Sequence, residues 1–224
     1  MSKNIQNPLT NDKCVLILGM HRSGTSVLSH AIDILGADLG DTLLKASKDN
    51  QKGYFENKRF LDLNNEILHS IGCTWDNLIV PTLIPDSEIY TDKISNAIIT
   101  EFTGSNFYSI KDPRIIRIKD LWVNAFRKLE ITPYFIISNR HPFEVARSLL
   151  KRNAIPKKTS LLLWITHQID GLLLVLNNNG LVITYDNFLR DPHSTIHNIA
   201  HYLNIPTSNK DKDIANFCHD FIDN

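Results

Sequence analysis

The sequence predicts an α/β fold, a doubly wound and mostly parallel sheet with helices on both faces. Four short apolar runs, rich in β-branched and aromatic residues, are typical of strands buried on both faces. They lie at residues 14–18, 107–111, 134–138 and 181–185. Segments with apolar residues at helical spacing separate these runs, and such alternation of strand and helix indicates parallel strands joined by helical crossovers.

The helices are expected between and after these strands. Residues 25–36 have apolar positions at helical spacing and close on Gly36, a residue type that commonly ends helices. Residues 57–72 close in the same way on Gly72. Five further segments have a helical pattern, namely 92–102, 117–129, 142–152, 159–177 and 194–203.

Two stretches between these elements are predicted to be loops over a site. Residues 36–57 are polar without a clear period, and residues 73–90 contain two prolines. No repeat or low-complexity tract divides the chain, and its 224 residues suit one α/β domain. We therefore expect a single domain over residues 1–224, with residues 1–12 forming a disordered N-terminal tail.

Composition narrows the class of protein. The 24 basic and 24 acidic residues balance, which argues against a broad nucleic-acid-binding face and makes any anion site local. Cys14, Cys73 and Cys218 form no C-x-x-C pair and indicate reduced thiols inside a cell. The polar N-terminus has no signal-peptide core, and no apolar stretch approaches the roughly 20 residues of a membrane helix. We expect a cytoplasmic protein that binds neither nucleic acid nor membrane.

The segment GMHRSGTS, residues 19–26, joins the first predicted strand to the first predicted helix. In this context a glycine-rich turn presents backbone N–H groups and the positive end of a helix dipole to one anion. Gly19 leaves the strand, and Gly24 permits close approach of the backbone. The polar residues expected at the anion are Arg22, Ser23, Thr25 and Ser26.

This loop differs from that of the nucleoside triphosphatases. Their signature, G-x-x-x-x-G-K-[ST], has a lysine where this chain has Thr25. The strand at 134–138 runs into Asn139 and Arg140 and not into a magnesium-binding aspartate. The pattern predicts an anion held by arginine and amides without a metal, which weakens a small-molecule kinase as the alternative function.

A second anion site is predicted after the third strand, in FIISNRHPFEVARSLLKR. Arg140 comes directly after the strand, where side chains of a parallel sheet reach a ligand crevice. Ser148 lies eight residues later on the following helix, so its hydroxyl can reach the same anion. Two such sites at neighbouring strand ends favour a nucleotide phosphorylated at both its 5′ and 3′ positions.

The two motifs, in this order, resemble those of the PAPS-dependent sulfotransferases, which use 3′-phosphoadenosine 5′-phosphosulfate (PAPS). GMHRSGTS is similar to their 5′-phosphosulfate loop, and Arg140 and Ser148 match their 3′-phosphate clamp. The resemblance covers about Cys14 to Leu203 and implies a P-loop-like fold, PAPS as co-substrate and transfer of a sulfuryl group to a hydroxyl. The chain lacks the tryptophan after the loop and the late R-K-G segment of the cytosolic enzymes, so the bacterial and glycan-modifying branches fit better.

The resemblance also implies roles at the reacting centre. Lys111, in IKDPR, resembles the lysine of a K-D-P segment near the transferred group, although a solvated strand-end lysine has the same pattern. Glu56 lies where tyrosylprotein and several bacterial members carry a glutamate base, although an acid at a helix N-terminus is the simpler alternative. Arg22 would stabilise the leaving phosphate. Asp112 is expected to cap the turn before Pro113 or to pair with the neighbouring arginine.

Other features are expected to be structural, and several questions stay open. His193, His197 and His201 recur on an amphipathic helix and are expected at the surface, not around a metal. Trp164, on an apolar helix, is expected in the core. The acceptor could be a saccharide or another small metabolite, and the chain could form a homodimer. A catalytically silent nucleotide-binding protein with an interaction role is the second alternative.

Overall fold

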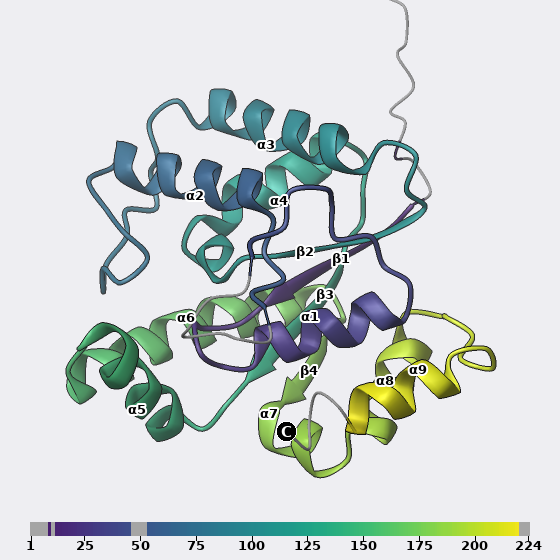
Figure 1. Ribbon diagram of the computed structural model, residues 1–224. Helices are drawn as coiled ribbons and strands as arrows, with labels where there is room; N and C mark the ends of the chain where they lie inside the picture. Colours follow the sequence, from purple (N-terminus) through teal and green to yellow (C-terminus); the bar gives the residue numbers. More distant parts are fainter. Residues whose placement is uncertain (1–8, 10–11, 46–52, 220–224) are drawn as a thin grey trace, which may run out of the picture.

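The computed structural model describes residues 9, 12–45 and 53–219 (Figure 1). Its sheet has four parallel strands in the order β2-β1-β3-β4, which confirms the predicted fold class. The strand order reverses between β1 and β3, and ligands of such sheets bind at the carboxyl ends of the strands around that point. The strands are β1 (Lys13–Leu18), β2 (Phe107–Lys111), β3 (Tyr134–Asn139) and β4 (Leu181–Thr184).

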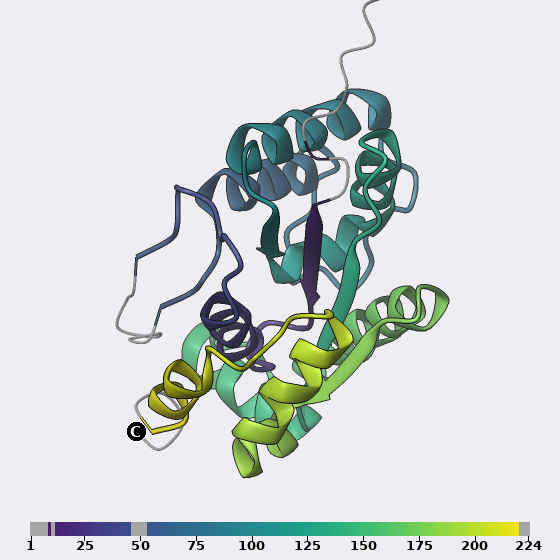
Figure 2. The same cartoon turned by 90° about the vertical axis from the view of Figure 1, so that its right-hand side faces the viewer.

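Helices surround this sheet. In chain order they are α1 (Thr25–Ile34), α2 (Lys58–Ser70), α3 (Ser87–Phe102), the 3₁₀ helix η1 (Pro113–Ile118), α4 (Lys119–Lys128), α5 (Pro142–Asn153), α6 (Lys157–Asn177), α7 (Tyr185–Arg190), α8 (Pro192–Tyr202) and α9 (Asp211–Phe217). Figure 1 shows α2, α3 and α4 on one side of the sheet and α1, α8 and α9 on the other. Figure 2 shows the same two layers from the side.

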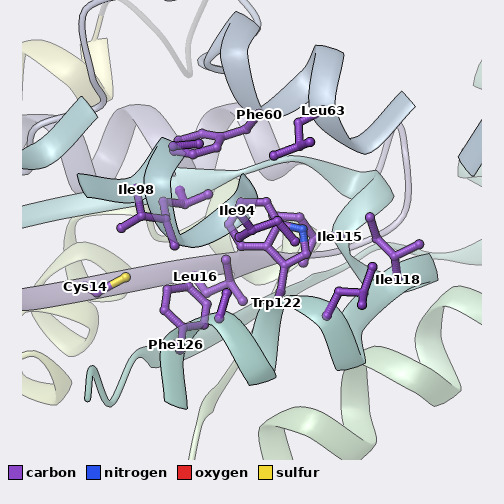
Figure 3. Packing of buried hydrophobic residues seen from close by; sticks show 14 of the residues in the cluster. Cys14, Leu16, Phe60, Leu63, Ile94, Ile98, Ile115, Ile118, Trp122 and Phe126 are labelled. Atoms are coloured by element: carbon purple, nitrogen blue, oxygen red, sulfur yellow. The ribbon is translucent and has the colours of Figure 1, made fainter. Parts of the chain in front are cut away.

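Alternate residues of the strands face two separate cores. On β1, Leu16 and Leu18 pack into the core beneath α2, α3 and α4, whereas Val15 and Ile17 pack against α1 and α8. The first core is built around the fully buried Trp122 of α4, which Figure 3 shows among its aliphatic and aromatic neighbours. Burial on both faces explains why the strand sequences are continuously apolar.

Several element boundaries differ from the predictions. The loop expected over 73–90 ends earlier, because α3 begins at Ser87. The helix expected over 117–129 is preceded by η1, where the Asp112 side chain accepts a hydrogen bond from the Arg114 amide and starts a helical turn directly after β2. The strand expected over 181–185 ends at Thr184. The short helices α7 and α9 were not predicted, since six or seven residues carry too little periodicity.

The expected N-terminal tail and the first expected loop are only partly described. Residues 1–8, 10 and 11 of the tail and residues 46–52 of the loop lie outside the described residues. Leu9, within the expected tail, is fully buried in the core beneath α2, α3 and α4.

The two edges of the sheet are closed in different ways. Beside β2, Asp38 forms a parallel bridge with Tyr108: its amide donates to the Phe107 carbonyl, and its carbonyl accepts from the Ser109 amide. At the other edge, β4 has only four residues before the chain turns into α7.

Helix α6 contradicts the expectation that no segment of the chain has the length and apolar composition of a membrane helix. Within the described part of the chain, this 21-residue helix is the one that is long and apolar enough, by length and composition alone, to cross a membrane. This helix was missed because the polar residues His167, Gln168 and Asp170 interrupt its apolar residues in the sequence. A third of its most apolar window is buried in the protein, and core helices of soluble proteins meet the same criterion.

Candidate active site

A pocket of about 130 Å³ lies where the carboxyl ends of the strands meet. Residues at or after the end of every strand form part of the pocket wall. The loop 21–27 follows β1, Lys111 ends β2, Arg140 follows β3, and Tyr185 follows β4. The pocket therefore occupies the position in which open parallel sheets bind their ligands.

The loop after β1 has the shape of an anion cradle. Arg22 has a left-handed backbone with φ of 69°, and Gly24, at the N-cap of α1, has φ of 95°. The structure shows no side-chain cap at this end of α1 among the described residues, so the first-turn amides face the pocket together with the positive end of the helix dipole. A Cβ atom on Gly24 would lie 2.2 Å from Cδ2 of Tyr185, so only glycine fits against that ring.

The predicted 5′ and 3′ anion sites are linked to one another through Arg22. Its Nε donates to Oγ of Ser148 over 2.7 Å, and its carbonyl accepts from Nη1 of Arg140 over 3.2 Å. The guanidinium of Arg140 lies 4.5 Å from the centroid of the Tyr185 ring, and the Trp164 indole donates to the Arg140 carbonyl over 3.0 Å. The structure thus brings together the arginine pair and the serine that the sequence singled out.

Glu56 and Lys111 form a buried ion pair in the wall of the pocket. Oε1 of Glu56 lies 2.6 Å from Nζ of Lys111, and the side chains are 8% and 3% exposed. The ammonium also donates to the Tyr54 carbonyl over 2.9 Å and to Oγ of Ser26 over 3.4 Å. Lys111 therefore connects the predicted base to the first turn of α1.

A hydrogen-bonded chain anchors this pair in the core. The Trp122 indole donates to Asn64, and the Asn64 amide donates to Oδ2 of Asp112 over 3.0 Å. Asp112 accepts from both the amide and Nη1 of Arg114, so it caps the turn and pairs with the arginine, whereas the sequence offered these as alternatives. Nη1 of Arg114 lies 3.7 Å from Oε2 of Glu56, which closes the chain on the predicted base.

Burial sets the protonation of the acid–base groups. It raises the pKa of Glu56 above the ordinary carboxyl value, while the Lys111 charge opposes the rise. A carboxylate with a raised pKa is a stronger base, as proton abstraction requires. Burial, helped by the charges of Arg114 and Arg152, lowers the pKa of His21 well below its usual value, so this imidazole is neutral at pH 7. Its Nε2 has no hydrogen-bond partner among the described residues.

Most predicted site residues line the pocket. Those on its wall are Arg22, Gly24, Thr25, Ser26, Glu56, Lys111 and Arg140. Ser148 reaches it through Arg22. Ser23 is different, because its hydroxyl donates to the Met20 carbonyl and its own carbonyl accepts from Ser138. The fully buried Ser23 side chain therefore stabilises the loop and does not line the pocket.

The sequence assigns no role to several residues of the wall. It places Tyr185 inside the last strand, although the position directly after β4 is the same signal that identifies Arg140. Tyr54, Arg152 and His21 also line the pocket. Arg152 comes from α5, where nothing in the sequence distinguishes it from Lys151.

The remaining candidates lie away from the pocket wall. His193 and His201 are exposed on α8, and the described residues contain no cluster of three or more side chains that could hold a metal. His167 is fully buried on α6, and its Nδ1–H donates to the Leu163 carbonyl over 2.8 Å.

His167 provides a prediction for stability against pH. Burial, followed by the charge of Arg117, lowers its pKa to about 4 from 6.5. The unfolded chain takes up this proton below the ordinary value and the folded chain does not, so the free energy of unfolding should fall by roughly 3 kcal/mol as the pH drops across that interval. Denaturant titrations of the wild type and of His167→Gln check this. If the free energy of unfolding of the variant fell with pH as steeply as that of the wild type, the prediction would be contradicted.

Comparison with solved structures shows that this fold is similar to that of three sulfotransferases. The sulfotransferase domain of the Synechococcus PCC 7002 olefin synthase aligns with a TM-score of 0.55 and 16% identity, over 89% of this chain and 76% of its own. Sulfotransferase STF9 from Mycobacterium avium aligns with a TM-score of 0.51 and 14% identity, over 94% of this chain and 69% of its own. Sulfotransferase STF1 from Mycobacterium tuberculosis H37Rv aligns with a TM-score of 0.51 and 10% identity, over 92% of this chain and 71% of its own. No family model and no curated protein matches the chain.

Proposed function

We propose that this protein is a sulfotransferase that moves a sulfuryl group from PAPS to the hydroxyl of a small-molecule acceptor. The observation that carries the proposal is one pocket, on this fold, that joins three features. They are a helix N-terminus without a side-chain cap, two linked arginines and a buried carboxylate–lysine pair. Sulfuryl transfer needs these functions: anion binding, charge stabilisation and a base.

In this proposal the donor lies along the arginine pair. The first-turn amides of α1 and Arg22 hold the 5′-phosphosulfate, and Arg140 and Ser148 hold the 3′-phosphate. The contacts support this assignment, because Arg22 hydrogen-bonds to both Ser148 and Arg140 and so lies beside the residues assigned to the 3′-phosphate. The bound donor supplies an activated sulfuryl group.

Transfer then depends on the Glu56–Lys111 pair. Glu56 takes the proton of the acceptor hydroxyl while the acceptor oxygen forms a bond to sulfur and the bond from sulfur to the phosphate oxygen breaks. Lys111 and Arg22 stabilise the negative charge that collects on the leaving phosphate. Lys111 pairs with Glu56 in the structure, and in this proposal its charge also reaches the donor, which leaves the carboxylate to act as the base.

Calorimetric titration with adenosine 3′,5′-bisphosphate, beside ATP with and without magnesium, tests the donor site. We expect the bisphosphate to bind without metal and Arg140→Ala to weaken it about 10- to 100-fold, since a hydrogen bond to a charged group contributes about 1.5–3 kcal/mol. Arg147→Ala is the matched control, because Arg147 is 78% exposed on α5, the helix that follows Arg140, and does not line the pocket.

Two other outcomes would reject the proposal. Binding of magnesium–ATP alone would favour a small-molecule kinase. Bisphosphate binding that is lost in Arg140→Ala, with no transfer to any of a varied set of hydroxyl acceptors, would favour a silent nucleotide-binding protein.

A further inference from the structure

An open groove of about 480 Å³, lined by both apolar and polar side chains, lies on the same side of the sheet as Trp122 and is separate from the donor pocket. Its walls are the loop 78–84, the junction of η1 with α4, and the middle of α6. Large side chains on these walls are unusually exposed for their type, with Ile79 at 84%, Leu83 at 85% and Ile169 at 55%. A volume of this size is typical of sites for small organic ligands.

The 3₁₀ helix η1 connects the groove to the active site. Its first residue, Pro113, lines the donor pocket two positions after Lys111, and its last residues, Arg117 and Ile118, line the groove. At a rise of about 2 Å per residue, the two ends of η1 are roughly 10 Å apart. The donor pocket and the groove therefore lie at opposite ends of one short helix.

The loop that forms the other wall also begins at the active site. The ring of Trp75 lies 4.2 Å from that of His21, which lines the donor pocket. Arg117 then fastens the loop, donating from Nη2 to the carbonyls of Asn77 and Leu78 over 2.9 and 3.2 Å. These contacts connect the loop wall of the groove to a residue of the donor pocket.

We propose that the acceptor is an alcohol with an apolar body, whose hydroxyl meets Glu56 and whose body lies in this groove. This inference rests on the proposed sulfuryl transfer and names its substrate class. An apolar body would remove Ile79, Leu83 and Ile169 from water, which is favourable. Lys119 and Asp170, which also line the groove, already pair with one another, so the hydroxyl groups of a saccharide would gain fewer partners there than they lose in water.

Transfer rates for a homologous series of primary alcohols, from butanol through hexanol and octanol to decanol, test the proposal, with methyl glucoside beside them. We expect kcat/KM to rise about two- to fourfold per methylene group, since each buried methylene contributes about 0.8 kcal/mol. The double variant Ile79→Asp/Leu83→Asp should flatten this rise while butanol is still sulfated. Leu176→Asp, at a leucine that is 70% exposed on α6 outside the groove, should leave it unchanged.

Two binding measurements separate the possible failures. Calorimetry with decanol, with and without the bisphosphate, reports the groove without turnover. If the bisphosphate binds but chain length affects neither decanol binding nor kcat/KM, this inference is overturned and the proposed function stands. If the bisphosphate does not bind, the proposed function fails, and decanol binding that is lost in Ile79→Asp/Leu83→Asp still supports an apolar ligand.

Light scattering tests the competing occupant, a second copy of the chain. We expect the same oligomeric state for the wild type and for Ile79→Asp/Leu83→Asp. A dimer that becomes a monomer in the variant, with the dependence on chain length unchanged, would make the groove a subunit interface and would overturn the proposal.

Discussion

Replacing Glu56 by glutamine is expected to lower kcat by about 10²- to 10⁴-fold, the usual contribution of a general base. The amide keeps the shape of the side chain but cannot take the acceptor's proton. Affinity for the bisphosphate should not weaken, because Lys111, relieved of its carboxylate partner, remains beside the cradle. Single-turnover rates and bisphosphate calorimetry on the same variant separate the two effects.

The same change should also destabilise the protein. It leaves the ammonium of Lys111 buried with only neutral partners, the Tyr54 carbonyl and the Ser26 hydroxyl, and loss of one member of a buried pair typically costs about 3–5 kcal/mol. The double variant Glu56→Gln/Lys111→Met removes the unpaired charge, so urea unfolding should recover while turnover does not. Full turnover in Glu56→Gln would instead assign the base to another group, with neutral His21 on the same wall as the first candidate.

Replacing Gly24 by alanine is expected to damage both the cradle and the fold. The new Cβ would lie 2.2 Å from Cδ2 and 2.9 Å from Cε2 of Tyr185, at a backbone φ of 95° that side chains rarely adopt. The loop or the ring must move, and we expect bisphosphate affinity to fall more than tenfold. Stability should fall by about 3 kcal/mol, since the backbone strain alone costs about 1–2 kcal/mol.

Gly104→Ala is the control that isolates the clash. Gly104 has nearly the same backbone, with φ of 93°, but a Cβ atom added there would meet no atom of the described residues within 4 Å. The variant should therefore lose only the cost of the strained backbone and keep its affinity for the bisphosphate. Equal losses in the two variants, measured by thermal unfolding and calorimetry, would show that contact with Tyr185 is unimportant.

The part of the site that follows the strands could be predicted from the sequence. Gly24 and Arg140 follow closely after apolar runs, and in a parallel sheet the ends of such runs converge whatever the path of the chain between them. Tyr185 obeys the same rule and was missed because the apolar run extends one residue beyond the strand. Tyrosine is enriched in strands, so its identity favoured a place inside the strand and did not mark the strand's end.

The pairing within the site could not be predicted in the same way. Glu56 contacts Lys111 although the two residues are 55 positions apart, and such a contact leaves no local pattern. The chain from Trp122 through Asn64 to Asp112 joins residues 48 to 58 positions apart. Such contacts depend on the order of strands in the sheet and on loop paths, which periodicity does not encode.

The closed edges of the sheet bear on how the protein behaves at high concentration. An exposed edge strand can pair with another chain and start aggregation. Here residues around Asp38 already occupy hydrogen-bonding groups of β2, and the four residues of β4 are too few to make a good template. Intermolecular β-pairing is therefore disfavoured at both ends of the sheet, and self-association of the folded chain would have to proceed through side chains.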